Sequence, residues 1–180
     1  MSSLLDTRYQ DLLTAANELS PEVNLLLKKF QKTNETTIIR ALEELRDRIA
    51  DPKFLPTRSQ QKAFALHFAN IFTTLSQHRL PNVRLALFQC LTDGLLKAPA
   101  GKAVVAHSIK EIIPWWLLAC ADPVKETAAA ASAALALLSP TGRRQVITET
   151  VSSILRVISV DDVPLVARVR CLGSLLPSIV

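Results

Sequence analysis

The sequence of 180 residues contains only 4 glycines and 5 % aromatic residues, although 49 % of its residues are apolar. β-Hairpins use glycine in their tight turns, and strands favour aromatic and β-branched side chains. Such scarcity argues against a sandwich or a barrel. No segment alternates apolar and polar residues over the length of a strand, so we predict no β-sheet.

Residues that carry catalytic or metal chemistry are also scarce. The three cysteines, Cys90, Cys120 and Cys171, are scattered, which is typical of buried thiols rather than of a disulfide framework. The cysteines and histidines lack the short spacings of a zinc site, and no serine or cysteine stands in a nucleophile motif. We therefore expect no cofactor, no metal, no small-molecule substrate and no catalysis by this chain itself.

The start of the chain lacks the basic and continuous apolar segments of a signal peptide. The most apolar window, residues 104–121, is interrupted by His107, Lys110, Glu111 and Pro114, which a membrane span would not tolerate. The sequence predicts a soluble, monomeric protein of the cytosol without a membrane partner.

Apolar residues at helical spacing are abundant. Ile38, Leu42, Leu45 and Ile49 form one such stripe, and comparable stripes recur along the chain. Each is the i, i+4, i+7, i+11 face of an amphipathic helix. Short segments rich in Pro, Ser, Thr, Asn or Asp separate the stripes and mark helix ends. We expect eight or nine helices joined by short loops.

Residues 81–96, 123–138 and 161–176 align as repeats, each ending in a Leu-Leu pair, at offsets of 42 and 38 residues. This is the period of a two-helix HEAT or armadillo unit. The predicted fold is therefore an all-α, HEAT/armadillo-like α-solenoid of about four helical hairpins. We expect one domain over residues 1–180, built from a leading helix at 1–19 and hairpins at 20–52, 57–97, 100–138 and 140–180. Because the last helix lacks a polar capping repeat, we also expect a fragment of a longer solenoid.

The segment 108–138 illustrates one predicted hairpin. Pro114 is expected to bend its first helix, and the turn at Asp122 to reverse the chain. The alanines at 128–131, 133 and 134 are expected to let the second helix approach its neighbours closely. Of Trp115 and Trp116, we expect one in the core and the other at a surface or a repeat interface.

The net charge of +5 is unevenly distributed. Residues 53–110 contain 8 basic residues and a single acid, Asp93, whereas acids balance or outnumber bases on either side. A field localised in this way suits an acidic partner, nucleic acid included, although a solvated basic face without a partner is the alternative.

Basic residues at predicted turns are the candidate partner-binding residues, because they can reach phosphates without entering a groove. They fall into three groups along the chain. These are Lys28, Lys29 and Lys32, then Arg79 and Arg84, then Lys97, Lys102 and Lys110.

Two blocks of the sequence resemble the listerin family of RING-type E3 ubiquitin ligases, which act in ribosome-associated quality control. In residues 25–49 the matching positions are Glu35-Thr36-Thr37 and Ala41-Leu42-x-x-Leu45. In residues 82–125 they are Val83-Arg84, Lys102, Lys110, Ile113-Pro114 and Leu117-Leu118.

This resemblance implies a long HEAT-type solenoid whose catalytic RING lies outside this chain. It further implies that the N-terminal domain helps to hold the ligase on stalled 60S ribosomal subunits, near the partner factor that recognises peptidyl-tRNA. Whether the basic surface contacts rRNA, a ribosomal protein or the partner factor is left open. Thr36, Thr37 and Arg40 of the first block join the candidate partner-binding residues. The rival hypothesis is a generic HEAT-repeat adaptor that binds an acidic protein.

Overall fold

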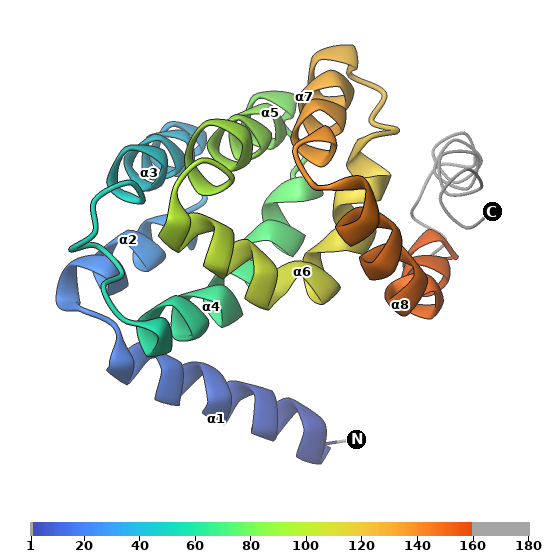
Figure 1. Ribbon diagram of the computed structural model, residues 1–180. Helices are drawn as coiled ribbons and strands as arrows, with labels where there is room; N and C mark the ends of the chain where they lie inside the picture. The colour runs from blue at the N-terminus through green and yellow to red at the C-terminus, as the bar shows by residue number, and fades with distance from the viewer. Residues whose placement is uncertain (1, 160–180) are drawn as a thin grey trace.

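The computed structural model describes residues 2–159, which form eight α-helices and one π-helical turn with no β-strand among them (Figure 1). The all-α prediction is therefore confirmed for this part of the chain, whereas the aligned segment 161–176 lies outside it. The elements are α1 (Ser2–Glu18), α2 (Pro21–Phe30), α3 (Glu35–Arg48), α4 (Arg58–Ser76), α5 (Pro81–Cys90), η1 (Leu91–Leu95), α6 (Pro99–Ala119), α7 (Lys125–Ala136) and α8 (Pro140–Ile158).

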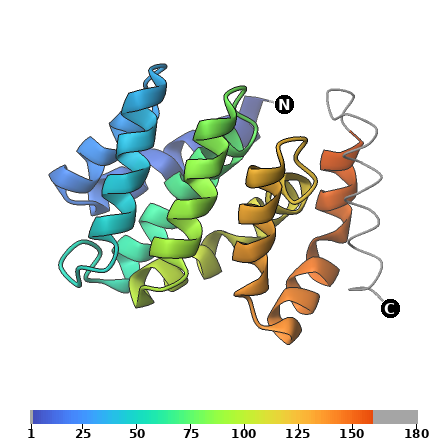
Figure 2. The ribbon, with the colours of Figure 1, turned by 90° about the horizontal axis from the view of Figure 1, so that it is seen from above.

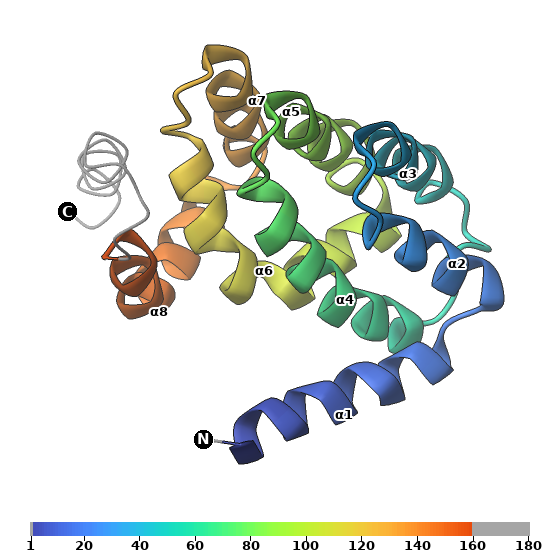
Figure 3. The same cartoon turned by 180° about the vertical axis from the view of Figure 1, so that it is seen from behind.

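The helices pack in two main layers (Figure 1). α3, α5 and α7 lie side by side in one layer, and α4, α6 and α8 lie side by side in the other. Each of the pairs α2–α3, α4–α5 and α6–α7 is also in contact, which is the packing of a helical solenoid and confirms the predicted architecture. α1 packs on α4 from the side opposite to the α3–α5–α7 layer (Figures 1 and 3).

The sequence signals at the helix ends act as expected. Side-chain oxygens of Ser20, Asn34, Thr57 and Ser139 accept hydrogen bonds from backbone N–H groups in the first turns of α2, α3, α4 and α8. These N–H groups have no partner within the helix, so each cap satisfies one of them. Proline occupies the first turn of α2, α5, α6 and α8, where its missing N–H costs nothing.

A line of aromatic side chains on α4 forms the centre of the core. Phe64, Phe68 and Phe72 recur every four residues and are fully buried. Phe72 contacts Phe88 of α5 edge-on, with ring centroids 5.7 Å apart, and Trp116 of α6 at 6.3 Å. α4 thereby contacts both α5, its partner in the same hairpin, and α6 of the next hairpin. Burial of each of these side chains stabilises the fold by about 2 kcal/mol.

The α6–α7 pair depends on a tryptophan. α6 continues through the buried Pro114 as far as Ala119. Beyond this proline, Trp116 is fully buried and its Nε1 donates a hydrogen bond of 2.9 Å to the carbonyl oxygen of Ala131 in α7. Trp115 is half-buried and packs against the edge of the core. The expected division between the two tryptophans is therefore observed.

The predicted role of the alanines holds for only part of the set. Ala131 and Ala134 are fully buried, and they bring α7 close to its neighbours. Ala129 and Ala133, for which the same role was predicted, are exposed. The prediction was wrong for these two because they lie on the opposite face of the helix from Ala131 and Ala134.

Replacing Ala134 by Leu should lower the free energy of unfolding by about 2 kcal/mol, because no space is left for the larger side chain. The matched change Ala133→Leu should alter it by less than about 0.5 kcal/mol, because that position is exposed. Urea denaturation followed by circular dichroism measures both values. Equal effects would show that α7 does not use this face for packing.

Candidate functional site

Loops between the antiparallel helices gather at two opposite edges of the solenoid (Figure 2). Loops 31–34, 77–80 and 120–124 lie along one edge, which we call the hairpin edge because each joins the two helices of one pair. Loops 49–57, 96–98 and 137–139 lie along the other, which we call the junction edge because each joins successive pairs. The candidate residues divide between these two edges.

Five candidates from the α2–α3 and α4–α5 regions are exposed at or near the hairpin edge: Lys28, Lys32, Thr36, Arg40 and Arg79. Their side chains have no ion-pair or hydrogen-bond partner among the described residues. Four cations and one hydroxyl are therefore free to contact a partner, with little desolvation to overcome beforehand.

Two further candidates at this edge have structural partners. Lys29 forms an ion pair with Glu44, with 2.5 Å between Nζ and Oε2, and so links α2 to α3. Thr37 donates its backbone N–H to Oδ1 of Asn34 at 3.1 Å, which starts α3. Both side chains are half-buried. Lys29 therefore ties the end of α2 to α3, and Thr37 helps to fix the start of α3, beside the exposed Lys32 and Thr36.

Arg84 belongs to the same edge but points inward. Its guanidinium and the carboxylate of Asp122 form two hydrogen bonds of 2.7 and 2.9 Å, and the side chains are only 11 % and 6 % exposed. Arg84 also donates to the carbonyl oxygens of His78 and Arg79. Asp122 accepts a further hydrogen bond from the N–H of Val124. Arg84 therefore fixes two loops of the edge and offers little of itself to a partner.

The remaining candidates lie elsewhere. Lys97 is on the junction edge and pairs with Asp93 at 2.8 Å. Lys102 is also there, exposed and without a partner among the described residues. Lys110 is in the middle of α6 and pairs with Glu149 of α8 at 3.0 Å. The length of the helices separates Lys97 and Lys102 from the hairpin edge, so the candidates do not form a single cluster.

Several exposed cations were absent from the sequence-based set. Lys125 adds a cation to the hairpin edge, while Lys53 and Arg58 add two to the junction edge. Each of these three residues lies within a few residues of a predicted helix break, and this proximity could have identified them as loop-edge cations. The charge count over residues 53–110 could not assign a cation to one edge, because residues of that block lie at both edges.

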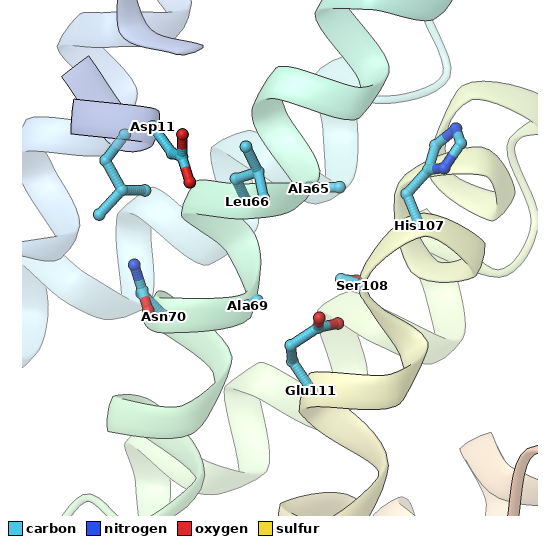
Figure 4. A pocket seen from close by; sticks show the side chains of 9 residues that line it. Asp11, Ala65, Leu66, Ala69, Asn70, His107, Ser108 and Glu111 are labelled. Carbon is cyan, nitrogen blue, oxygen red and sulfur yellow. The ribbon is translucent and has the colours of Figure 1, made fainter. Parts of the chain in front are cut away.

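A groove between α1, α4 and α6, with a volume of about 220 Å³, brings a serine, a histidine and two carboxylates together (Figure 4). The buried Ser108 donates its hydroxyl to the carbonyl oxygen of Val104 at 2.9 Å. His107 is exposed and projects away from Ser108, and Asp11 and Glu111 stand on different helices (Figure 4). Within the described residues no hydrogen bond joins the serine to the histidine, so these side chains do not form a nucleophile–base pair.

The described cysteines are poor nucleophiles. Burial raises the pKa of the Cys90 thiol to about 12 and that of Cys120 to about 11, so both are protonated at neutral pH. Cys171 lies outside the described residues.

Residues 2–159 contain no group of three or more His, Cys, Asp or Glu that could hold a metal ion. No helix in the same range is long and apolar enough to cross a membrane.

The fold and the charge arrangement define an α-helical repeat domain that presents several unpaired cations in or near its loops. A comparison with protein families matches residues 18–160 to the N-terminal domain of the E3 ubiquitin-protein ligase listerin. The chain belongs to this family, and the resemblance noted from its sequence is confirmed. No curated protein and no solved structure matches the chain significantly.

Replacing Arg84 by Met should lower the free energy of unfolding by about 3 kcal/mol, because the carboxylate of Asp122 would remain buried without its counter-charge. Lys97→Met removes the exposed ion pair with Asp93 and should lower the free energy of unfolding by about 0.5 kcal/mol or less. Chemical denaturation at low and high salt measures both. Comparable losses in the two variants would contradict the structural role of Arg84.

Proposed function

We propose that this domain docks a listerin-type E3 ubiquitin ligase on stalled 60S ribosomal subunits in the cytosol, so that the ligase can ubiquitinate nascent chains for degradation. The domain itself supplies binding and no chemistry. The hairpin edge makes the contact, together with the partner factor that recognises peptidyl-tRNA.

The observation that carries this proposal is a set of unpartnered cations at the end of α2, in the loop after it and in α3. Lys28, Lys32 and Arg40 are exposed, as is Thr36, which lies one helical turn before Arg40 and belongs to the block by which the chain resembles its family. Exposed cations attract a phosphate backbone over the Debye length, and a hydroxyl can add a directed hydrogen bond.

The rigidity of the edge supports the same proposal. The α4–α5 loop, which carries Arg79, and the α6–α7 loop, which precedes Lys125, are held together by the Arg84–Asp122 pair. A surface whose loops are already ordered loses less conformational entropy on binding. Arg79 and Lys125, which lie in or next to these two loops, can therefore meet an extended partner in a fixed arrangement.

Replacing Lys28, Lys32 and Arg79 together by Glu should weaken binding to purified 60S subunits by at least about tenfold, because three attractive charges become repulsive. The slope of log K against log salt concentration should also fall by about 2 to 3. Co-sedimentation over a salt series, with and without peptidyl-tRNA and the partner factor, measures both quantities.

The matched control reverses three exposed cations of the junction edge, Lys53, Arg58 and Lys102, and so changes the net charge equally. This variant should keep most of the affinity. Equal loss in both variants would mean that binding follows net charge rather than one edge. Binding to acidic peptides but not to 60S subunits would instead identify a generic adaptor.

A further inference from the structure

An apolar groove opens at the junction edge, between α6, α8 and the loop that joins α7 to α8. We call it the junction groove. It has a volume of about 420 Å³, within the range of sites that hold a ligand or an anchoring side chain. Its apolar lining is Leu96, Val105, Ile109, Leu137, Leu138 and Val146. Leu137 is 55 % exposed, although it stands beside this apolar surface.

The first junction of the same edge shows how the fold closes such a space. The loop 49–57 turns Phe54 and Leu55 inward, where both are buried. The ring of Phe54 meets the edge of Phe64 of α4, with 6.2 Å between centroids. An aromatic and an aliphatic side chain from the loop therefore fill the space between α2, α3 and α4.

The second junction is closed by direct backbone contact. A Cβ atom at Gly101, in the first turn of α6, would lie only 2.4 Å from the carbonyl oxygen of Leu95. Glycine thus lets α6 lie against η1 without a gap between them.

The third junction has neither device. α8 begins like α6, with proline two residues before Gly142, but a Cβ at Gly142 would meet only the side chain of Ser139. In the loop 137–139, Leu137 is exposed and Leu138 is only partly buried. Among the described residues, therefore, neither a fully buried loop side chain nor a close glycine contact fills the junction groove.

Charge at the rim indicates the kind of partner. The ammonium group of Lys102 is exposed and has no partner within the described range. The carboxylate of Glu149, also at the rim, is already engaged by Lys110 at 3.0 Å and by Gln145 at 2.9 Å. The unmatched charge is therefore positive and stands beside an apolar lining. This combination suits a protein segment that carries an apolar anchor and a carboxylate better than it suits a polynucleotide.

We propose that the junction groove is a docking site for a segment of a partner protein that inserts an aromatic or aliphatic side chain and places a carboxylate on Lys102. This site is separate from the hairpin edge and does not depend on ribosome docking.

The test uses the 180-residue chain and a fluorescein-labelled peptide with the sequence Asp-Asp-Phe-Leu-Asp-Asp. Its Phe-Leu pair copies the side chains that fill the first junction. Fluorescence anisotropy should show saturable binding, and the methyl signals of Leu137 and Val146 should shift in NMR spectra. Replacing Phe-Leu by Ser-Ser, or the aspartates by lysines, should weaken binding by about tenfold, since burial of one apolar side chain corresponds to at least that factor.

Ala106→Trp should also weaken peptide binding by about tenfold, because Ala106 lines the groove and is exposed, so that the indole would occupy the space. Ala129→Trp places the same side chain at an exposed position of α7 outside the groove and should leave binding unchanged. Thermal unfolding followed by circular dichroism checks that both variants are folded.

Four results would overturn the proposal. The first is the absence of methyl shifts up to about 1 mM peptide, which is the limit of useful affinity. The second is equal binding of the Ser-Ser peptide. The third is tighter binding of single-stranded RNA than of peptide at the same methyl groups. The fourth is occupation of the groove by the chain itself, seen either as concentration-dependent dimers or as NOE contacts from Leu137 to residues 160–180.

Discussion

The buried ion pair between Arg84 and Asp122 is the interaction on which the hairpin edge depends. Arg84 lies in the first turn of α5 and Asp122 lies in the loop before α7, so their two hydrogen bonds fix the spacing of neighbouring helix pairs. Arg84 also holds the carbonyl groups of His78 and Arg79, while Asp122 holds the N–H of Val124. Most hydrogen-bonding groups of the pair are therefore satisfied, which a charge pair at this depth requires. The pair therefore orders the loop that carries Arg79 and the loop that precedes Lys125, although it is itself almost inaccessible.

Local patterns predicted the helices well because a helix is a local structure. The stripe from Ile38 to Ile49 is buried as its spacing requires, and the caps at Asn34 and Thr57 are observed. The role of Arg84 could not be predicted in the same way. In the sequence Arg79 and Arg84 are two cations on either side of a proline turn, and nothing local shows that Arg84 points inward, because its partner lies 38 residues further along the chain. The division of the candidates between two edges was likewise hidden, because it depends on the direction of each helix.

The starts of α6 and α8 show the same limit at the level of packing. Both have proline at the first position, glycine at the third and a basic residue at the fourth, so sequence alone assigns them the same environment. In the structure Gly101 touches the backbone of Leu95, whereas Gly142 faces the junction groove. The difference arises from what precedes each helix, namely a π-helical turn in one case and the short loop 137–139 in the other. A repeated motif thus indicates a repeated position in the fold but not the contacts made there.

Ion pairing differs from place to place on this solenoid. Two lysines on helices form ion pairs with acids of neighbouring helices, namely Lys29–Glu44 between α2 and α3 and Lys110–Glu149 between α6 and α8. Lys32 and Arg79, in loops of the hairpin edge, are exposed and have no acidic partner among the described residues. Their charge remains in water and is unpaired at little cost in stability, because exposed pairs contribute little in any case. Binding to an extended anion can therefore use the edge cations without breaking an existing contact. A contact with Lys29 or Lys110 would first have to compete with the ion pair that each of them forms.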